Sequence, residues 1–420
     1  MTRKLVIAAL VVLAAWSGSA RAEAGFVPAA NATDMVYDFR RHQIDIANGD
    51  EVVRYAVDSA SLLPSVSLPG AALRGIDISR DGSMLALADA TTDATHNWVH
   101  LVQLPALTTS KRSFDLDSGE GGIWSVAFAA DGALLVTSMF NGSGWVPLRR
   151  LIPATGTWTA LASVTQNTML AASTDRNTIA FAEANISDGR WGLYDVPTGQ
   201  MVRREWYTDG TSAFNYEIAT DALGAQFVIP TYQGMYVYND VYQKIWTVPP
   251  NDHAAVGVAF HPVLPLVYYA CSGTRQVRVF NTRLGKLVAW YDMGDTFTWN
   301  GNGAYQSGRL KLSADGSLLM ATTGGGVRYL RMYAPLTAAN VSATVNSGVA
   351  ANVALKGSIG NNGTLAYVIW NKPKHGTVTL TGATARYQSV AGYKGTDSFR
   401  YMVRYGAAAY VVATANVTVR

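Results

Sequence analysis

Short apolar strands alternate with polar turns along most of the chain, and this pattern recurs. The clearest turns contain Asp-Gly pairs, at Asp81-Gly82, Asp131-Gly132 and Asp315-Gly316. Asp accepts hydrogen bonds from nearby backbone amides and Gly readily adopts positive φ, so the pair favours a tight turn between two strands. Seven such turns recur in the sequence, at a spacing of roughly 40 to 50 residues that is typical of four-stranded propeller blades. The pattern predicts an all-β fold, with a seven-bladed β-propeller over residues 23–335.

The last repeat contains only three clear strands, at 309–313, 318–322 and 327–332. A blade with one strand missing would leave unpaired backbone groups at an open edge of the ring. We therefore expect an N-terminal segment, Phe26 to Ala30, to pair there and complete the blade.

The first two repeats also carry recognisable sequence motifs. Residues 35–87 contain Val36-Tyr37-Asp38 and, further on, Gly75-Ile76-Asp77-Ile78-Ser79-Arg80-Asp81-Gly82. This region resembles the YVTN-type propellers, a branch of the wider WD-like group. Because those families include binding proteins, lactonases and lyases, the resemblance implies a scaffold and leaves the activity open.

The repeat ends near Pro335, and residues 336–420 follow a different strand pattern. Two motifs mark this region, the segments 372–380 and 392–401. They resemble the cadherin-like and Ig-like repeats of bacterial surface adhesins and secreted enzymes, which implies a second, small β-sandwich. Such repeats often bind calcium, but residues 357–364 contain no Asp or Glu, so we expect no oxygen-rich calcium cage there. His375 lies in a turn of this motif, where we interpret it as structural.

Residues 1–22 have the pattern of a signal peptide. Arg3 and Lys4 precede an apolar run, and Ala20-Arg21-Ala22 provides a small-x-small cleavage site. The run is too short to cross a bilayer of roughly 30 Å. We therefore expect a secreted or periplasmic protein without a membrane span. Cys271 is the sole cysteine, so no intrachain disulfide is expected.

The remaining charges are almost balanced. Without residues 1–22 the chain has 30 basic and 29 acidic residues, a balance that argues against nucleic-acid binding. We interpret the arginine pair Arg149-Arg150 as solvated, and Asp115, Asp117 and Glu120 as a solvated acidic turn. No metal site and no cofactor are predicted.

In a propeller, the loops between the second and third strands of each blade share one face with the connections between blades. We expect a ligand to approach this face. Aromatic side chains and planar polar groups alternate there, which suits a polyhydroxylated ligand. The candidate ligand-binding residues are Trp145, Asn141, Asp188, Trp299, Asn300, Asn302 and Tyr305. For Trp98, Trp124 and Trp191 we favour a packing role between blades.

Titratable residues near the same face leave an enzymatic alternative open. His96, His253 and Arg309 are the candidate catalytic residues, as a proton-transferring histidine and a neutralising arginine. The sequence contains no nucleophile elbow, phosphate loop or His-x-x-x-His pair.

The leading hypothesis is a secreted binding protein that recognises a carbohydrate or another cell-surface ligand, with an adhesin-like accessory domain. The alternative is an extracellular polysaccharide lyase or lactonase that uses the same propeller face. Another protein remains possible as the partner.

Overall fold

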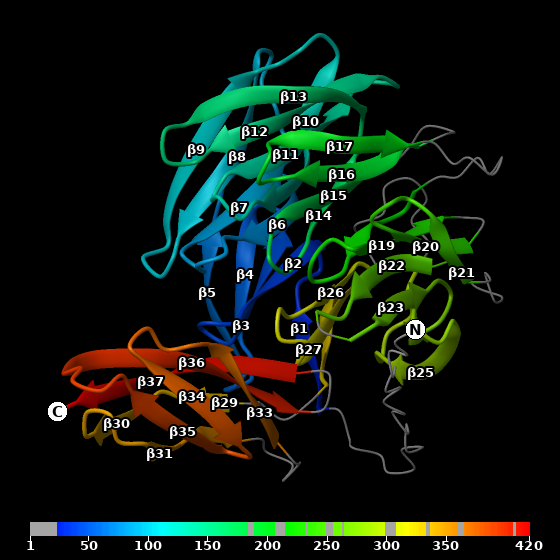
Figure 1. Cartoon of the computed structure of the whole chain (residues 1–420). Coiled ribbons are helices and arrows are strands. Elements are labelled where there is room, and N and C mark those ends of the chain that lie inside the picture. The colour runs from blue at the N-terminus through cyan, green and yellow to red at the C-terminus, as the bar shows by residue number, and fades with distance from the viewer. Residues whose placement is uncertain are drawn as a thin grey trace, which may run out of the picture.

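The computed structural model describes residues 23–183, 189–205, 215–231, 234–248, 255–262, 264–298, 308–332, 337–358, 365–405 and 409–420. Strands dominate these residues, and they contain no helix. Accordingly, no helix in the described ranges could span a membrane. The all-β prediction is confirmed, with a β-propeller first and an Ig-like sandwich after it (Figure 1).

Between residues 23 and 331, the described strands form seven four-stranded antiparallel sheets. The first three sheets pair in chain order and consist of β2 (Ala32–Asp38), β3 (Gln43–Asn48), β4 (Glu51–Ala56) and β5 (Ser61–Ser67); β6 (Leu73–Ile78), β7 (Met84–Asp89), β8 (His96–Gln103) and β9 (Thr108–Asp115); and β10 (Glu120–Phe128), β11 (Leu134–Phe140), β12 (Trp145–Ile152) and β13 (Thr157–Thr165). The next three consist of β14 (Met169–Ala172), β15 (Thr178–Ala182), β16 (Trp191–Asp195) and β17 (Gln200–Glu205); β18 (Ala219–Thr220), β19 (Gln226–Thr231), β20 (Gly234–Asn239) and β21 (Lys244–Val248); and β22 (Ala255–Phe260), β23 (Leu266–Cys271), β24 (Gln276–Asn281) and β25 (Lys286–Asp292).

The last sheet joins the two ends of the propeller sequence. Its order is β1 (Glu23–Pro28), β28 (Gly326–Arg331), β27 (Leu318–Thr323) and β26 (Leu310–Leu312). Phe26 is in register with Arg328, and the amide of Ala29 donates to the carbonyl of Gly325 at 3.2 Å. The expectation that the N-terminal segment completes this sheet is confirmed, although the strand begins three residues earlier than predicted.

The first strands of successive sheets contact one another around a common axis. These inner strands are β2, β6, β10, β14, β18, β22 and β26, and β26 contacts β2 again. Apolar side chains fill the spaces between neighbouring sheets; one core cluster unites Met35, Ile44 and Ile46 of the first sheet with Met320 and Val327 of the last. Burial between sheets therefore holds the ring together.

The predicted Asp-Gly turns join the first and second strands of their sheets. The amides of Ser83 and Ser317 donate to Asp81 and Asp315 at 3.0 Å each. Gly82 and Gly316 have φ values of 66° and 72°, a region that glycine adopts without strain. The local chemistry of the sequence thus accounts for these turns.

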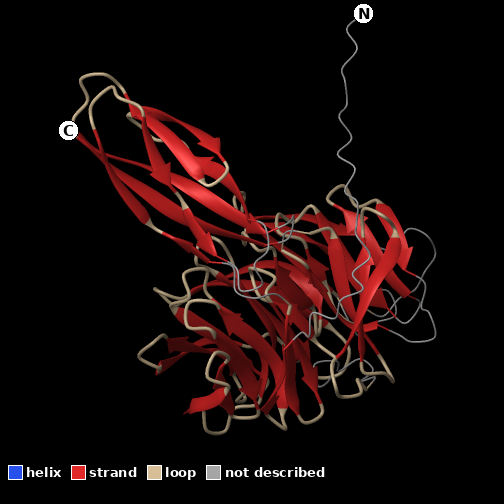
Figure 2. Ribbon diagram, turned by 90° about the horizontal axis from the view of Figure 1, so that it is seen from below, coloured by secondary structure: helices blue, strands red, loops and turns tan. Residues whose placement is uncertain are grey.

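The second domain is a sandwich. One sheet has the order β30 (Val341–Val345), β37 (Ala409–Val419), β36 (Gly395–Tyr405) and β33 (Leu365–Asn371). The other sheets are β31 (Ala351–Ala354), β35 (Thr384–Ser389) and β34 (Gly376–Thr381), and the pair β29 (Thr337–Ala339) and β32 (Lys356–Ser358). Tyr387, Phe399 and Tyr401 are among the residues buried between them. Figure 2 shows the sandwich extending to one side of the propeller.

Candidate ligand-binding face of the propeller

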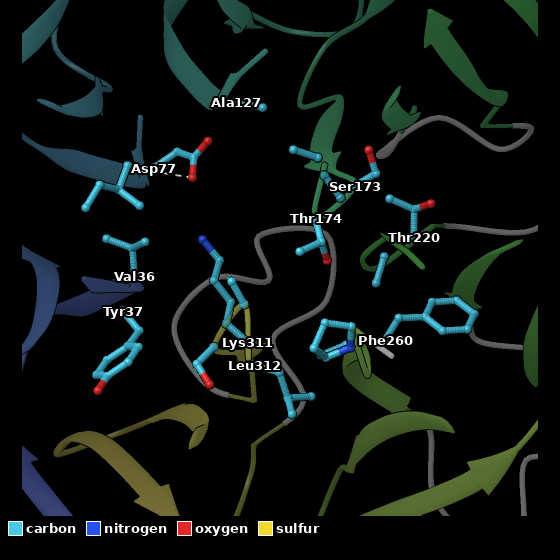
Figure 3. Close-up of a pocket in the computed structure, with 18 of the residues that line it drawn as sticks. Val36, Tyr37, Asp77, Ala127, Ser173, Thr174, Thr220, Phe260, Lys311 and Leu312 are labelled. Carbon is cyan, nitrogen blue, oxygen red and sulfur yellow. Dashed lines mark hydrogen bonds between the residues drawn. The ribbon is translucent and has the colours of Figure 1, made fainter. Parts of the chain in front are cut away.

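An axial cavity of about 390 Å³ is lined by the inner strands of all seven described sheets. Small apolar side chains form much of its wall, and turns between first and second strands contribute Ser79, Arg80, Ser173 and Thr174. Figure 3 shows Lys311 reaching from β26 into this cavity, toward the side where Val36 and Asp77 lie. A cavity of this size can hold a small ligand.

Charged groups from three sheets and a backbone carbonyl from a fourth meet beside the axial cavity. Arg309 donates through Nε to Oδ1 of Asp34 at 2.6 Å and through Nη1 to both carboxylate oxygens of Glu217, at 3.0 and 2.8 Å. Lys311 Nζ donates to Asp34 at 3.1 Å and to the carbonyl of Ile76 at 3.2 Å. Since these groups belong to the first, second, fifth and last sheets, the cluster ties the ring together across its axis.

The two carboxyl groups of this cluster respond differently to burial. Burial alone would raise the pKa of Asp34, but the charges of Arg309 and Lys311 and the amide of Ile76 hold that pKa below its usual value. Burial raises the pKa of Glu217 despite the attraction of Arg309. Arg309, which is only 5% exposed, is thus engaged by two carboxylates rather than displayed to a ligand.

A second ion pair, between Arg176 and Asp77, also lines the axial cavity. Arg176 donates to both carboxylate oxygens of Asp77, at 2.6 and 3.0 Å, and to the carbonyl of Phe128 at 3.0 Å. The amide of Phe128 donates to Asp77 at 2.7 Å. These bonds join the fourth, second and third sheets, so they too act across blades.

The loop face that the sequence predicts to bind a ligand contains a second hollow, which is more open than the axial cavity. This loop hollow is lined by residues 92–96, residues 115–120 and Asn141. It lies where the loop from β7 to β8 meets the connection from β9 to β10. The structure therefore brings together two of the candidate residues, His96 and Asn141.

His96 lies among acceptors on the rim of the loop hollow. Its Nδ1 is 2.7 Å from Thr95 Oγ1 and 3.3 Å from Asp93 Oδ1, and its Nε2 is 3.5 Å from Asp115 Oδ1. The side chain is 44% exposed. Hydrogen bonds from the amides of Thr95 and His96 lower the pKa of Asp93 to about 2. The rim thus displays an imidazole and the carboxylates of Asp93 and Asp115 to solvent.

The base of the loop hollow corrects two interpretations from the sequence. Glu120 and Arg149 are not solvated: their side chains are 1% and 8% exposed, and Arg149 Nη2 donates to Glu120 Oε2 at 2.9 Å. The neighbouring Arg150 turns the other way and pairs with Asp131. Successive side chains of a strand point to opposite faces, so one arginine of a pair in a strand can be buried while the other is solvated.

Trp145 begins β12, directly after the loop that contains Asn141. Its side chain is 47% exposed, and the Arg190 guanidinium lies 5.7 Å from its ring centroid. Trp124 and Trp191 are buried, as the packing interpretation predicted. Trp98 is half-buried and donates to Asp89 at 2.7 Å. Trp145 is thus an exposed indole four residues after Asn141, although it does not itself line the loop hollow.

The structure does not bring Arg309 to the site that contains His96. Arg309 lines the axial cavity, and the loop hollow, which His96 lines, shares no lining residue with that cavity. His253, Asp188, Trp299, Asn300, Asn302 and Tyr305 lie outside the described residues.

Sequence reasoning missed Asp34, Asp77 and Glu217 as axial groups. Each is a carboxylate within an otherwise apolar segment, and this was the available signal.

Among the described residues, no group of three His, Cys, Asp or Glu side chains could hold a metal ion. Cys271 is buried, and burial raises its pKa to about 11, which does not favour a reactive thiolate.

In the sandwich, His375 has structural contacts. Its ring stacks on Tyr393, with centroids 4.3 Å apart and planes 8° from parallel. Its amide donates to Asp397 at 3.0 Å. These contacts agree with the structural interpretation of this histidine.

Comparison with known proteins identifies the fold of both domains. Residues 333–419 match the family model of the bacterial Ig domain. No curated protein matches the sequence. Solved structures similar to this chain include hydrazine synthase of Kuenenia stuttgartiensis, with a TM-score of 0.57 and 13% identity, covering 73% of this chain and 97% of that one.

Two further solved structures have the same TM-score of 0.57. The Cps50 (Swd1) β-propeller domain of Myceliophteria thermophila is 12% identical and covers 74% of this chain and 99% of its own. The U3-55K structure is 14% identical and covers 72% of this chain and 96% of its own. At these identities the likeness establishes fold alone. The chain is a β-propeller followed by a bacterial Ig domain.

Proposed function

We propose that this protein is a secreted or periplasmic binding protein whose propeller recognises a carbohydrate through the face that carries the loop hollow. The observation that carries the proposal is a hollow lined by His96, Asn141 and carboxylates, with the exposed Trp145 ring four residues after Asn141 at the start of β12. An aromatic face covers the apolar side of a sugar ring, while amides and carboxylates bind its hydroxyl groups.

Two further features support this proposal. The bacterial Ig domain is an adhesin-type module, and the N-terminal sequence has the pattern of an export signal. Trp299, Asn300, Asn302, Tyr305 and Asp188 are proposed contributors to the same face, because the sequence pattern predicts that they lie in its loops.

The enzymatic alternative has less support. A lyase using His96 with Arg309 needs the two side chains around one substrate, but His96 lines the loop hollow and Arg309 is held by Asp34 and Glu217 beside the axial cavity. Arg309 is therefore better explained as a structural cation.

A glycan array probed with the full chain tests the proposed face. Trp145→Ala should weaken the strongest glycan signal by about tenfold or more, because a central aromatic contact carries much of the binding energy. Asn141→Ala should weaken it less. Trp290→Ala is the matched control, since this indole is 61% exposed on β25, away from the loop hollow. Unchanged binding by both Trp145→Ala and Asn141→Ala would reject this face.

A further inference from the structure

The near-neutral total charge conceals two domains of opposite sign. Residues 23–335 contain 22 basic and 28 acidic residues, a formal charge of −6. Residues 336–420 contain eight basic residues and one acidic residue, a formal charge of +7. A domain of this size with one carboxylate side chain presents an almost purely cationic surface.

The single acid of the sandwich is used internally. Asp397 is 7% exposed. It accepts hydrogen bonds from the amides of Lys374, His375 and Ser398 and from the hydroxyl of Tyr387, at 2.9 to 3.0 Å. Burial alone would raise the pKa of Asp397, but these donors lower it. The ionised carboxylate thus anchors the turn between β33 and β34 from within and does not neutralise the surface.

Four of the cations lie along the turn between β33 and β34 and the first half of β36. Asn371, the last residue of β33, is in register with Arg400 of β36, and Lys372 and Lys374 follow directly. Lys394 immediately precedes β36. All four side chains are exposed, and in the described ranges none has a carboxylate within 4.0 Å. We call Lys372, Lys374, Lys394 and Arg400 the basic end.

An exposed aromatic ring lies beside these cations. Trp370, next to the end of β33, is 53% exposed. The core-facing positions of the two strands are Tyr367 and Ile369 on β33 and Tyr401 and Val403 on β36. Because side chains alternate along a strand, Trp370 and Arg400 belong to the outer face. The basic end therefore combines a flat apolar ring with several positive charges.

We propose that the basic end of the Ig domain is a second binding site, separate from the propeller face, and that its ligand is an acidic polysaccharide. The Trp370 ring can stack on the apolar side of a sugar, while the flanking ammonium and guanidinium groups attract carboxylates along the polymer. The net negative propeller is repelled by the same polymer. The opposite charges of the domains would thus orient the molecule with its sandwich toward the polysaccharide.

The chemistry favours a polysaccharide over other polyanions. Three of the four cations are lysines, which act as point charges for any anion, so the preference for a polymer of sugar rings comes from the exposed Trp370 ring. The basic end consists of turns and part of β36 within a four-stranded sheet, and its described residues contain no helix of the kind that reads a DNA groove. Figure 2 shows the C-terminal end of the sandwich, where Val419 pairs with Gly395 beside Lys394, pointing away from the propeller.

The test is binding of the full chain to immobilised polygalacturonate over a range of NaCl concentrations. The quadruple variant Lys372→Gln, Lys374→Gln, Lys394→Gln, Arg400→Gln should bind polygalacturonate about tenfold more weakly. Each exposed contact between a cation and a carboxylate adds only a modest increment to the binding free energy. Its salt dependence should also be shallower, because fewer screened charges remain in contact.

A second quadruple variant gives a matched control for net charge. Arg40→Gln, Lys111→Gln, Arg283→Gln and Lys286→Gln remove four exposed cations from the propeller, and binding should change by less than about threefold. Trp370→Ala should weaken binding while leaving the salt dependence unchanged, because it removes stacking but no charge. Thermal unfolding of each variant confirms that it is folded.

Several outcomes would overturn the inference. Equal losses in the two quadruple variants would mean that only net charge matters. Tighter binding to duplex DNA or to anionic phospholipid vesicles than to polygalacturonate at the same salt concentration would reject the polysaccharide. Trp145→Ala should leave binding to polygalacturonate unchanged, so failure of the basic end and failure of the propeller face can be told apart.

Discussion

The axial cluster and the loop hollow use the same kinds of side chain in opposite ways. On the axis, Arg309 and its two carboxylates are at most 5% exposed and satisfy one another across the ring. On the loop face, His96 and Trp145 are 44% and 47% exposed. A buried, mutually satisfied charge holds a fold together, whereas an exposed polar group can exchange water for a ligand. The comparison assigns stability to the axis and recognition to the loops.

The largest expected effect is on the axis. Arg309→Met leaves Asp34 and Glu217 buried without their shared cation, and it should lower the free energy of unfolding by about 3 to 5 kcal/mol. Urea denaturation measures this loss. Arg275→Met is the control, because Arg275 and Asp292 form an exposed pair with side chains 56% and 42% exposed, which should contribute at most about 1 kcal/mol. Equal losses in the two variants would contradict the structural role of the axial cluster.

The second-largest effect is expected from a buried histidine, which should make the folded protein less stable in acid. His261 is 1% exposed, and burial lowers its pKa to about 4 even though Asp315 opposes the shift. The unfolded chain binds a proton near pH 6.5 and the folded chain does not, so stability is complete above that pH and is lost as the pH falls toward 4. The loss from this group is at most about 3 kcal/mol.

His261→Asn tests this pH dependence. Asn keeps an acceptor for the Leu264 amide, which donates to His261 Nδ1 at 3.1 Å, but it does not titrate. Urea denaturation from pH 8 to pH 4 should therefore show a smaller loss of stability in the variant than in the native protein. The same slope in both proteins would show that His261 is not the group responsible.

The smallest stability effect is expected in the loop hollow. His96→Asn removes an exposed side chain and should change the free energy of unfolding by no more than about 0.5 kcal/mol. If this variant instead lost several kcal/mol in urea denaturation, the loop hollow would be part of the structural core and the contrast with the axis would fail.

Local patterns in the sequence predicted much of the fold. The turns at Asp81 and Asp315 follow from chemistry within a few residues, and the pairing of Phe26 with β28 follows from the need to complete an open sheet. The sandwich was marked by motifs such as the segment around Asp397.

The axial contacts could not be predicted in this way. Arg309 meets Asp34 across 275 positions and Glu217 across 92, so the partners depend on how the ring closes. Sequence reasoning therefore placed Arg309 with His96, on a shared face. The cationic sandwich was missed for another reason: the charge was summed over both domains, and opposite values cancelled.

The most direct test of recognition by the propeller is one paired measurement on Trp145→Ala, with glycan binding and unfolding free energy determined on the same preparation. The account predicts at least about tenfold weaker binding, with the unfolding free energy within about 1 kcal/mol of the native value. A folded Trp145→Ala protein that binds the same glycan with native affinity would contradict it.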